Sequence, residues 1–224
     1  MDSKDRIRGI DWSLYVIIDK EWLKGRLIQE VAFDVVRGGA GVIQYRDKVS
    51  ESRVFYEEAL KLRVVTAEND IPLIINDRVD MALAVDADGV HLGQNDLPVE
   101  VARRIVGEEM ILGASVHSLS EFEKMKNSDY FGVGAVYPTE TKEKAQIGGI
   151  DIIRKVRLRT HLPIVGIGGI TLDNFVPVVR AGADGVAVIS AILGADDVEK
   201  ATKRFVIGVK RAKSMEVLKN DGLS

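Results

Sequence analysis

The chain has 224 residues, a net charge of −3 and 46% hydrophobic residues, and it contains no cysteine. The absence of cysteine excludes disulfides and cysteine-ligated metal sites, and the interspersed charges lack the basic stripe of a nucleic-acid-binding surface. No apolar run reaches the ~20 residues of a membrane span, and residues 1–10 lack the apolar segment of a signal peptide. We therefore expect a soluble, cytoplasmic protein.

Segments typical of strands alternate with segments typical of helices along the whole chain. Short runs rich in Val, Ile and Leu predict strands over 14–19, 42–46, 73–76, 89–92, 111–116, 130–137, 163–167 and 185–189. Helical spacing and capping residues predict helices over 26–37, 50–68, 78–85, from about Pro98, after Ser118 or Ser120, and over 150–158, 174–181 and 196–213. Ser50 is the expected N-cap of the second helix.

Eight strands alternating with eight helices predict an α/β fold, a single (β/α)₈ TIM barrel formed by residues 1–224 with a frayed end at 220–224. A doubly wound open sheet is the competing architecture. It is disfavoured because eight such units in so short a chain leave no room for its usual longer insertions. No linker or shift in composition interrupts the pattern.

Polar side chains gather at the end of the second predicted strand, where the sequence reads Val-Ile-Gln-Tyr-Arg-Asp-Lys over 42–48. Successive side chains of a strand alternate between its faces, so Gln44, Arg46 and Lys48 project from one face. Two cations and an amide suit a multiply charged anion such as a phosphate ester. A strand end that meets solvent and neighbouring acids explains these residues equally well.

Carboxylates and amides follow the neighbouring strands, and barrel active sites lie at these strand ends. Asn76 and Asp77 end the third strand, Asp96 follows the fourth, and Ser115 lies in the fifth. Asp77 and Asp96 are candidate Mg²⁺ ligands, because Mg²⁺ prefers one or two carboxylates together with substrate phosphates. Each aspartate taken alone fits a helix cap better.

A second phosphate site is expected after the seventh and eighth strands. Gly166-Ile167-Gly168-Gly169 could offer backbone N–H groups there, and Ser190 a hydroxyl. The loop with Thr139, Thr141 and Lys142 could close over ligands, although its composition also fits an exposed charged loop. Of the histidines, we interpret His91 as a hydrogen-bonded core residue, whereas His117 could approach the site and His161 lies at the opposite face.

Six motifs follow one another at the predicted strand ends: Gln44-x-Arg46-x-Lys48, Asn76-Asp77, His91-Leu92-Gly93-Gln94-x-Asp96, Pro138-Thr139-x-Thr141-Lys142, Gly166-Ile167-Gly168-Gly169 and Val188-Ile189-Ser190. Together they resemble the thiamine-phosphate synthase family over essentially the whole chain. The chain departs from the family pattern at Asn95, where a carboxylate is common, and at Ala135, which replaces a frequent proline. Neither departure removes a charged group that the mechanism implied by the resemblance uses.

The resemblance implies a transferase of thiamine biosynthesis with small-molecule substrates. Such an enzyme joins 4-amino-5-hydroxymethyl-2-methylpyrimidine diphosphate to 4-methyl-5-(2-hydroxyethyl)thiazole phosphate, forming thiamine phosphate and diphosphate through a dissociative pyrimidine cation. It implies no nucleic-acid or membrane partner, and it leaves the oligomeric state open, a homo-oligomer included.

The resemblance also implies roles for individual residues. The residues that would hold the pyrimidine diphosphate are Gln44, Arg46, Lys48, Asn76, Ser115 and Lys142. Asp77 and Asp96 would hold Mg²⁺, the implied cofactor. The residues that would hold the thiazole phosphate are Thr139, Thr141, Gly169, Ile189 and Ser190. Those expected to carry catalysis are Arg46, Lys48, Lys142 and Ser115.

Two other functions fit the same fold. A related barrel that tautomerises a thiazole phosphate without metal would not need the full set of cations and carboxylates, which this chain keeps. A non-catalytic barrel that only binds phosphate ligands would be indicated by loss of Lys48, Asp77 or Lys142, and all three are present.

Overall fold

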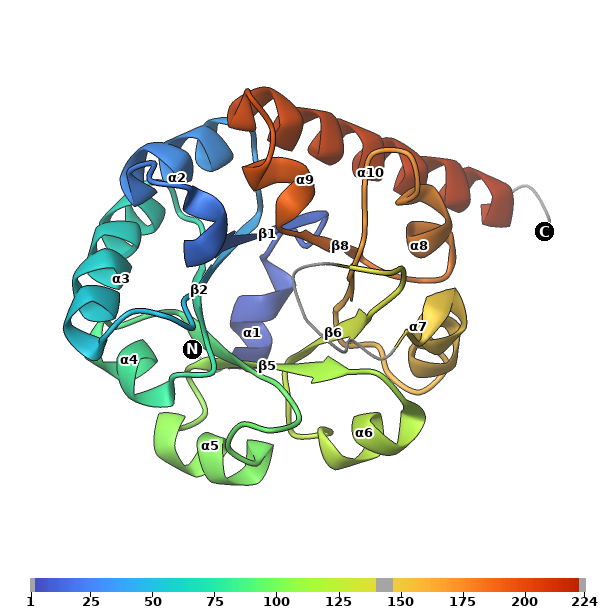
Figure 1. The fold of residues 1–224 in the computed structure, drawn as a ribbon. Coiled ribbons are helices and arrows are strands. Elements are labelled where there is room, and N and C mark those ends of the chain that lie inside the picture. Colours follow the sequence, from blue (N-terminus) through green and yellow to red (C-terminus); the bar gives the residue numbers. More distant parts are fainter. Residues whose placement is uncertain (1–2, 140–146, 222–224) are drawn as a thin grey trace.

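The computed structural model describes residues 3–139 and 147–221, and in these ranges eight parallel strands close into a barrel (Figure 1). The strands pair in chain order and β8 returns to β1. They are β1 (Leu14–Asp19), β2 (Val42–Arg46), β3 (Leu73–Asn76), β4 (Gly89–Leu92), β5 (Ile111–Val116), β6 (Tyr130–Gly134), β7 (Ile164–Ile167) and β8 (Gly185–Val188). The predicted (β/α)₈ barrel is confirmed.

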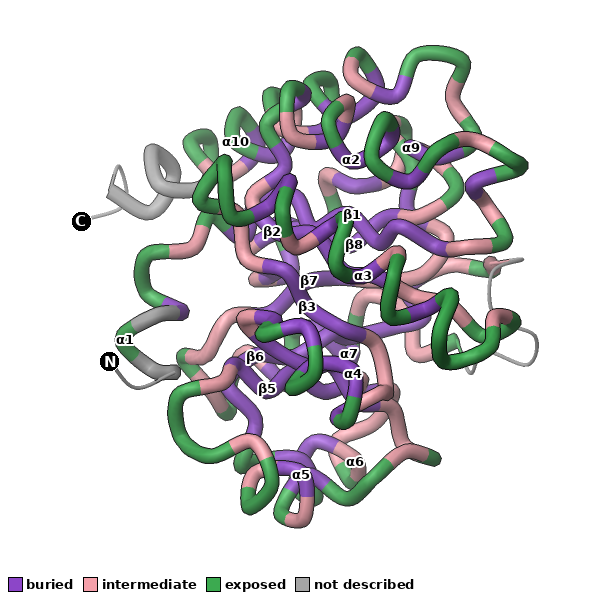
Figure 2. The backbone as a smooth tube through the Cα atoms, turned by 90° about the vertical axis from the view of Figure 1, so that its left-hand side faces the viewer, coloured by how far each residue is buried: buried purple, intermediate pink, exposed green. Residues whose placement is uncertain are grey.

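Helices form the outer ring of the molecule, and Figure 2 shows their exposed outer surfaces around the buried strands. The helical segments are α1 (Ser3–Arg8), which lies across one end of the barrel, the 3₁₀-helix η1 (Lys20–Leu23), α2 (Ile28–Arg37), α3 (Ser52–Ala67), α4 (Val79–Ala84), α5 (Val99–Val106), α6 (Leu119–Lys124), α7 (Gly149–Arg157), α8 (Val176–Arg180), α9 (Ser190–Leu193) and α10 (Val198–Asp221). The sequence pattern did not indicate α1, η1 or α9. The last helix extends to Asp221, beyond the predicted end at residue 213. Residues 222–224 of the expected frayed end lie outside the described residues.

Alternation along the strands divides the apolar residues into two cores. On β1, Leu14, Val16 and Ile18 pack outward against the helices. Tyr15 and Ile17 point into the barrel, where they join a separate cluster with Ile74, Tyr130 and Val165. This is the period of two that strand geometry dictates. The barrel is therefore a packed structure, and its interior side chains support whatever lies at its open end.

The amino-terminal end of the barrel is closed by α1 and the turn that follows it. Ile7 and Trp12 are buried in the interior cluster, and the Trp12 Nε1–H donates to the Ile7 carbonyl at 3.1 Å. In Figure 1, α1 lies across the centre of the ring. The opposite end, where the strands finish, is therefore the face available for a site.

Two sequence predictions on local structure are wrong. Ser50 does not cap α3, whose N-cap is Glu51 without a side-chain hydrogen bond. The turn before the helix is held by Asp47 Oδ1, which accepts from the backbone N–H groups of Val49 and Ser50. The sixth strand ends at Gly134, three residues earlier than predicted. Backbone bonds from Val136 and Tyr137 to β7 and the residue after it continue beyond that point, which explains the strand-like pattern.

Candidate active site

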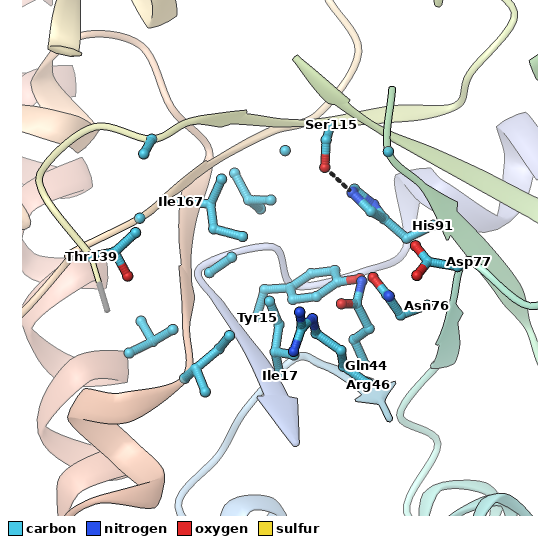
Figure 3. Close-up of a pocket in the computed structure, with 18 of the residues that line it drawn as sticks. Tyr15, Ile17, Gln44, Arg46, Asn76, Asp77, His91, Ser115, Thr139 and Ile167 are labelled. Atoms are coloured by element: carbon cyan, nitrogen blue, oxygen red, sulfur yellow. Dashed lines mark hydrogen bonds between the residues drawn. The ribbon is translucent and has the colours of Figure 1, made fainter. Parts of the chain in front are cut away.

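A cavity of about 250 Å³ opens at the carboxyl ends of the strands (Figure 3). All eight strands, or the residues directly after them, contribute to its lining. Its polar lining residues include Tyr15, Gln44, Arg46, Lys48, Asn76, Asp77, His91, Gln94, Asn95, Asp96, Ser115, His117, Thr139 and Ser190. Ile17, Val165, Ile167, Ala187 and Val188 supply its apolar surface. A cavity with apolar walls and a few convergent polar groups is typical of a small-molecule site.

The cationic side of the cavity comes from β2. Gln44 pairs in register with Ile17 of β1, and Arg46 pairs with Asp19, so both project into the barrel as their alternation predicted. Asp19 is only 2% exposed and forms an ion pair with the Arg46 guanidinium, while its other oxygen accepts from the Glu21 N–H at 3.0 Å. The buried carboxylate thus fixes the orientation of Arg46, because a buried charge needs a partner.

Two carboxylates lie beside Lys48. The Lys48 ammonium forms an ion pair with Asp77, whose side chain is also within hydrogen-bond contact of Asp96. Burial raises the pKa of Asp77 to about 6, with a further contribution from Asp96, whereas Lys48 acts in the opposite direction. Two adjacent carboxylates repel each other when both are charged. This part of the cavity is therefore a favourable place for an additional cation.

Neither aspartate caps a helix, which was the simpler interpretation of each. The N-cap of α4 is Arg78 and that of α5 is Pro98, and neither helix start has a side-chain cap bond. Asp96 instead accepts from the Gly93 N–H at 2.7 Å within its own turn. Both carboxylates therefore line the cavity, and neither caps a helix.

The floor of the cavity is a row of buried polar side chains. Gln44, Tyr15, Tyr130, His91 and Ser115 are joined by hydrogen bonds of 2.8 to 2.9 Å. Figure 3 shows the hydrogen bond between His91 and Ser115, and Tyr15 beside Gln44. His91 is buried and hydrogen-bonded, as we interpreted it from the sequence, and it also lines the cavity.

The opposite wall is built from the residues after β6, β7 and β8. Gly168 and Gly169 have φ values of 96° and 62°, which favour glycine, and a Cβ on Gly169 would lie 2.3 Å from the Pro138 carbonyl oxygen. Ile189 and Ser190 follow β8 at the start of α9, and Thr139 approaches from the loop after β6. In Figure 3, Thr139 lies across the cavity from Asp77 and His91.

The structure brings nearly all the predicted site residues together. Those that line the one cavity are Gln44, Arg46, Lys48, Asn76, Asp77, Asp96, Ser115, Thr139, Gly169, Ile189 and Ser190. Thr141 and Lys142 lie outside the described residues. His117 also lines the cavity, with Nδ1 bonded to Glu121, whereas His161 is exposed and apart from it.

Sequence reasoning missed Tyr15, Tyr130 and Asp19. Tyr15 and Tyr130 could not be recognised from the sequence, because their hydroxyls are hydrogen-bonded to each other across 115 positions of the chain. A usable signal existed for β1, because Tyr15, Ile17 and Asp19 alternate as Gln44 and Arg46 do, and adjacent parallel strands share an inner face.

Within the described ranges, no helix is long and apolar enough to cross a membrane, and no group of three or more His, Cys, Asp or Glu side chains is placed to hold a metal. The two carboxylates of the cavity are a pair, so any divalent ion there needs ligands from a bound molecule as well.

Comparison with known proteins identifies the family. Residues 14–192 match the family described as thiamine monophosphate synthase. Thiamine-phosphate synthases of Natronomonas pharaonis and Chloroflexus aurantiacus are 48% and 47% identical to the chain, covering 89% and 92% of it and 96% and 97% of their own lengths. The structure of the thiamine phosphate pyrophosphorylase from Pyrococcus furiosus is 43% identical with a TM-score of 0.82, over 90% of this chain and 97% of that one. The chain belongs to the thiamine monophosphate synthase family.

Proposed function

We propose that this cavity joins an aminopyrimidine diphosphate to a thiazole phosphate and releases diphosphate, which is the reaction of a thiamine-phosphate synthase. One observation carries the proposal: the cations of β2 and the carboxylate pair Asp77 and Asp96 meet on one side of the cavity, with a glycine- and hydroxyl-lined wall on the other. The high identity to enzymes with this name, over nearly their full lengths, supports it.

The cationic side suits the departing diphosphate. The bond between the methylene carbon of the pyrimidine and the bridging oxygen breaks, and its electron pair leaves with diphosphate. Arg46 and Lys48 then face growing negative charge, with Asn76 beside them as a hydrogen-bond donor. Groups already oriented toward developing charge stabilise the transition state most. Lys142 is proposed to join them, from outside the described residues.

The paired carboxylates fit Mg²⁺. Asp77 and Asp96 supply hard oxygen ligands, and the contribution of Asp96 to the raised pKa of Asp77 supports a place for added positive charge between them. When bound, Mg²⁺ would neutralise diphosphate oxygens as a Lewis acid. Lys48 contacts Asp77 in the structure, so this ammonium is placed to move from the carboxylate to the diphosphate when the ion is held by both aspartates.

The opposite wall suits the second substrate. Thr139, Gly169, Ile189 and Ser190 surround one end of the cavity and would hold the thiazole phosphate, together with Thr141, which lies outside the described residues. The thiazole nitrogen donates its lone pair to the methylene carbon, so no proton has to move and no protein nucleophile is required. Catalysis then consists of charge stabilisation and of holding the two substrates in line.

The alternatives from sequence remain less favourable. A metal-independent tautomerase has no use for cations and carboxylates at the same end of the cavity, yet Arg46, Lys48, Asp77 and Asp96 all line it. A barrel that only binds phosphate ligands does not explain two neighbouring carboxylates, one of them half-buried with a raised pKa, beside a cation.

Replacing each carboxylate tests the proposed metal site. Asp77→Asn and Asp96→Asn should each raise the Mg²⁺ concentration for half-maximal formation of thiamine phosphate by at least tenfold, because each removes one of two anionic ligands of one ion. The double variant should lose little more than the worse single variant. The measurement is an Mg²⁺ titration of initial rate.

Asp34→Asn is the control, since Asp34 lies on α2 in a surface ion pair with Arg37, away from the cavity, and should leave the titration unchanged. Full, unaltered Mg²⁺ response in both cavity variants would contradict the assignment.

A further inference from the structure

Strand β1 lies between the two ends of the cavity, because it pairs with β2 on one side and with β8 on the other. The 3₁₀-helix η1 follows β1 directly and ends at Lys24, which has a left-handed φ of 51°. The residues that flank η1 contact both neighbouring parts of the site. Asp19, before it, pairs with Arg46 of β2, and Arg26, after it, reaches the helix α9 that follows β8.

The Arg26 guanidinium joins η1 to the carboxyl end of α9. Its Nε–H donates to the Leu23 carbonyl at 3.0 Å, and its Nη2 donates to the carbonyls of Trp22, at 3.0 Å, and of Leu193. Leu193 is the last residue of α9, where carbonyl groups have no partner inside the helix. Arg26 supplies that partner from 167 positions away in the chain.

This junction depends on the shape of the guanidinium and not on an ion pair. Among the described residues, all hydrogen bonds of the partly buried Arg26 side chain go to backbone carbonyls, and none goes to a carboxylate. A rigid planar fork can engage several carbonyls at once, which an ammonium on a flexible stem cannot reproduce. A cation also interacts favourably with the carbonyl groups that end a helix.

Packing holds α9 at the same junction. A Cβ on Gly194, the C-cap of α9, would lie only 3.4 Å from Cζ3 of the Trp22 ring, so η1 covers this end of the helix. Ile192 and Leu193 are buried in the core beneath. A helix of four residues is not stable by itself, so these outside contacts determine where α9 lies.

One helical turn separates the junction from the cavity. The Gly194 N–H donates to the Ser190 carbonyl at 2.8 Å, and the Leu193 N–H donates to the Ile189 carbonyl at 2.9 Å. Ile189 and Ser190 line the cavity at the end proposed for the thiazole phosphate. A shift of the carboxyl end of α9 therefore moves the Ser190 hydroxyl.

We propose that Arg26 is a positioning residue for the thiazole phosphate end of the cavity, because it holds the carboxyl end of α9 against η1 and thereby fixes the direction of the Ser190 hydroxyl. Arg26 is not among the described residues that line the cavity, so it acts through α9 and not by contact with a ligand. The ligand of this end rests on the proposed function, whereas the hold of Arg26 on α9 does not.

Amide hydrogen exchange tests the hold on α9 without any ligand. Arg26→Gln removes the guanidinium and keeps a polar side chain. The N–H groups of Leu193 and Gly194 should exchange about tenfold faster in this variant, because the turn that they close opens more often. The Ala102 N–H, which donates to the Pro98 carbonyl in α5, should exchange at an unchanged rate. Unchanged exchange at Leu193 and Gly194 would overturn the proposal.

Ligand affinity tests the effect on the site. By calorimetry, Arg26→Gln should weaken binding of the thiazole phosphate about tenfold and change binding of the pyrimidine diphosphate less than twofold. Arg26→Lys keeps the charge without the planar fork, so its affinity for the thiazole phosphate should fall between those of the wild type and Arg26→Gln. An equal loss of affinity for both ligands, or no loss for either, would contradict a positioning role at one end.

Arg103→Gln is the matched control. Arg103 also donates to backbone carbonyls beside a helix end, those of Gly107 and Met110 at 2.9 Å, but at the closed end of the barrel. Because it also loses the ion pair with Asp129, this variant should be destabilised at least as much as Arg26→Gln and should keep both affinities. The same selective loss in Arg103→Gln would show that the effect follows from lower stability and would overturn the proposal.

The two proposals fail in different ways. If the wild-type protein forms no thiamine phosphate, but Arg26→Gln speeds exchange in α9 and selectively weakens the thiazole phosphate, the role of Arg26 is supported and the proposed function fails. If thiamine phosphate forms and Arg26→Gln changes neither property, the proposed function is supported and the role of Arg26 is wrong.

Discussion

At Asp77 the backbone adopts φ = 62°, a left-handed conformation that few residues other than glycine take. Its N–H donates to the His91 carbonyl at 2.8 Å, which ties the turn after β3 to the end of β4. The side chain is thereby held between Lys48 and Asp96. An unfavourable backbone conformation held by its neighbours is common where a side chain must be aimed at a ligand.

Ser190 distinguishes the two ends of the cavity. Ser190→Ala should raise KM for the thiazole phosphate about tenfold, because a hydroxyl that donates to a phosphate is lost, and should change KM for the pyrimidine diphosphate less than twofold. Steady-state kinetics with each substrate varied in turn measure both values. Ser214→Ala, on the exposed side of α10, should change neither. Equal changes in both constants after Ser190→Ala would contradict separate ends.

The strand-end rule was sufficient to find the charged residues that line the cavity, although not Asp19, which orients Arg46 from β1. Gln44, Arg46, Asp77 and Asp96 were identified because alternation and the barrel rule place such residues at the cavity without any knowledge of partners. Tyr130 could not be found this way. Tyr130 is the first residue of β6 and lies far from the carboxyl end of that strand. Its ring reaches the floor of the cavity only because Gly113 on the adjacent strand leaves the space.

At the scale of elements, a repeated clamp fastens the amino-terminal ends of the strands. Asp88, Asp129 and Asp184 lie just before β4, β6 and β8, and each accepts from the backbone N–H near the start of the preceding strand at 2.7 to 2.9 Å. Each also pairs with an arginine of an earlier helix, namely Arg63, Arg103 and Arg157. The clamps lie at the end opposite to the cavity and therefore contribute to stability.

The most buried clamp should be the most costly to break. Asp129→Asn leaves the Arg103 guanidinium, 13% exposed, without its charged partner at 2.6 Å. We expect a loss of about 3 kcal/mol in the free energy of unfolding, measured by denaturant titration, with both Michaelis constants unchanged. Asp151→Asn removes an exposed aspartate–arginine pair on α7 and should cost less than about 0.5 kcal/mol. A loss in Asp129→Asn no larger than in this control would contradict the clamp.

The sequence pattern did not reveal these clamps, because each arginine lies 25 to 27 positions before its aspartate in the chain. Element boundaries shifted for similar reasons. The turn before α3 is held by Asp47, which accepts from the N–H groups of Val49 and Ser50, and this contact was not recognised from the sequence pattern.

At the scale of the whole molecule, the barrel has one closed end and one open end. The closing helix α1 was not predicted because its sequence, SKDRIR, is mostly charged and gives no apolar period. Ile7 and the later Trp12 enter the interior, and their contact with Tyr15 and Tyr130 is a tertiary effect. The eight-unit alternation, in contrast, was visible from the sequence, since each strand and helix carries its own local period.

The types of residue along the barrel axis differ between the closed end and the open end. The closed end contains clamps and an apolar cluster, the middle contains the polar floor, and the open end contains the charged residues. The closed end and the packed middle support the site, and the open end supplies the chemistry.

The most direct test of the account is product formation by the wild-type protein. Mixed with the pyrimidine diphosphate, the thiazole phosphate and Mg²⁺, the protein should form thiamine phosphate and diphosphate in equal amounts. Formation should stop when Mg²⁺ is chelated and resume when it is restored. Neither product, with both substrates shown by calorimetry to bind in the presence of Mg²⁺, would contradict the account and leave a cavity that binds these ligands without joining them.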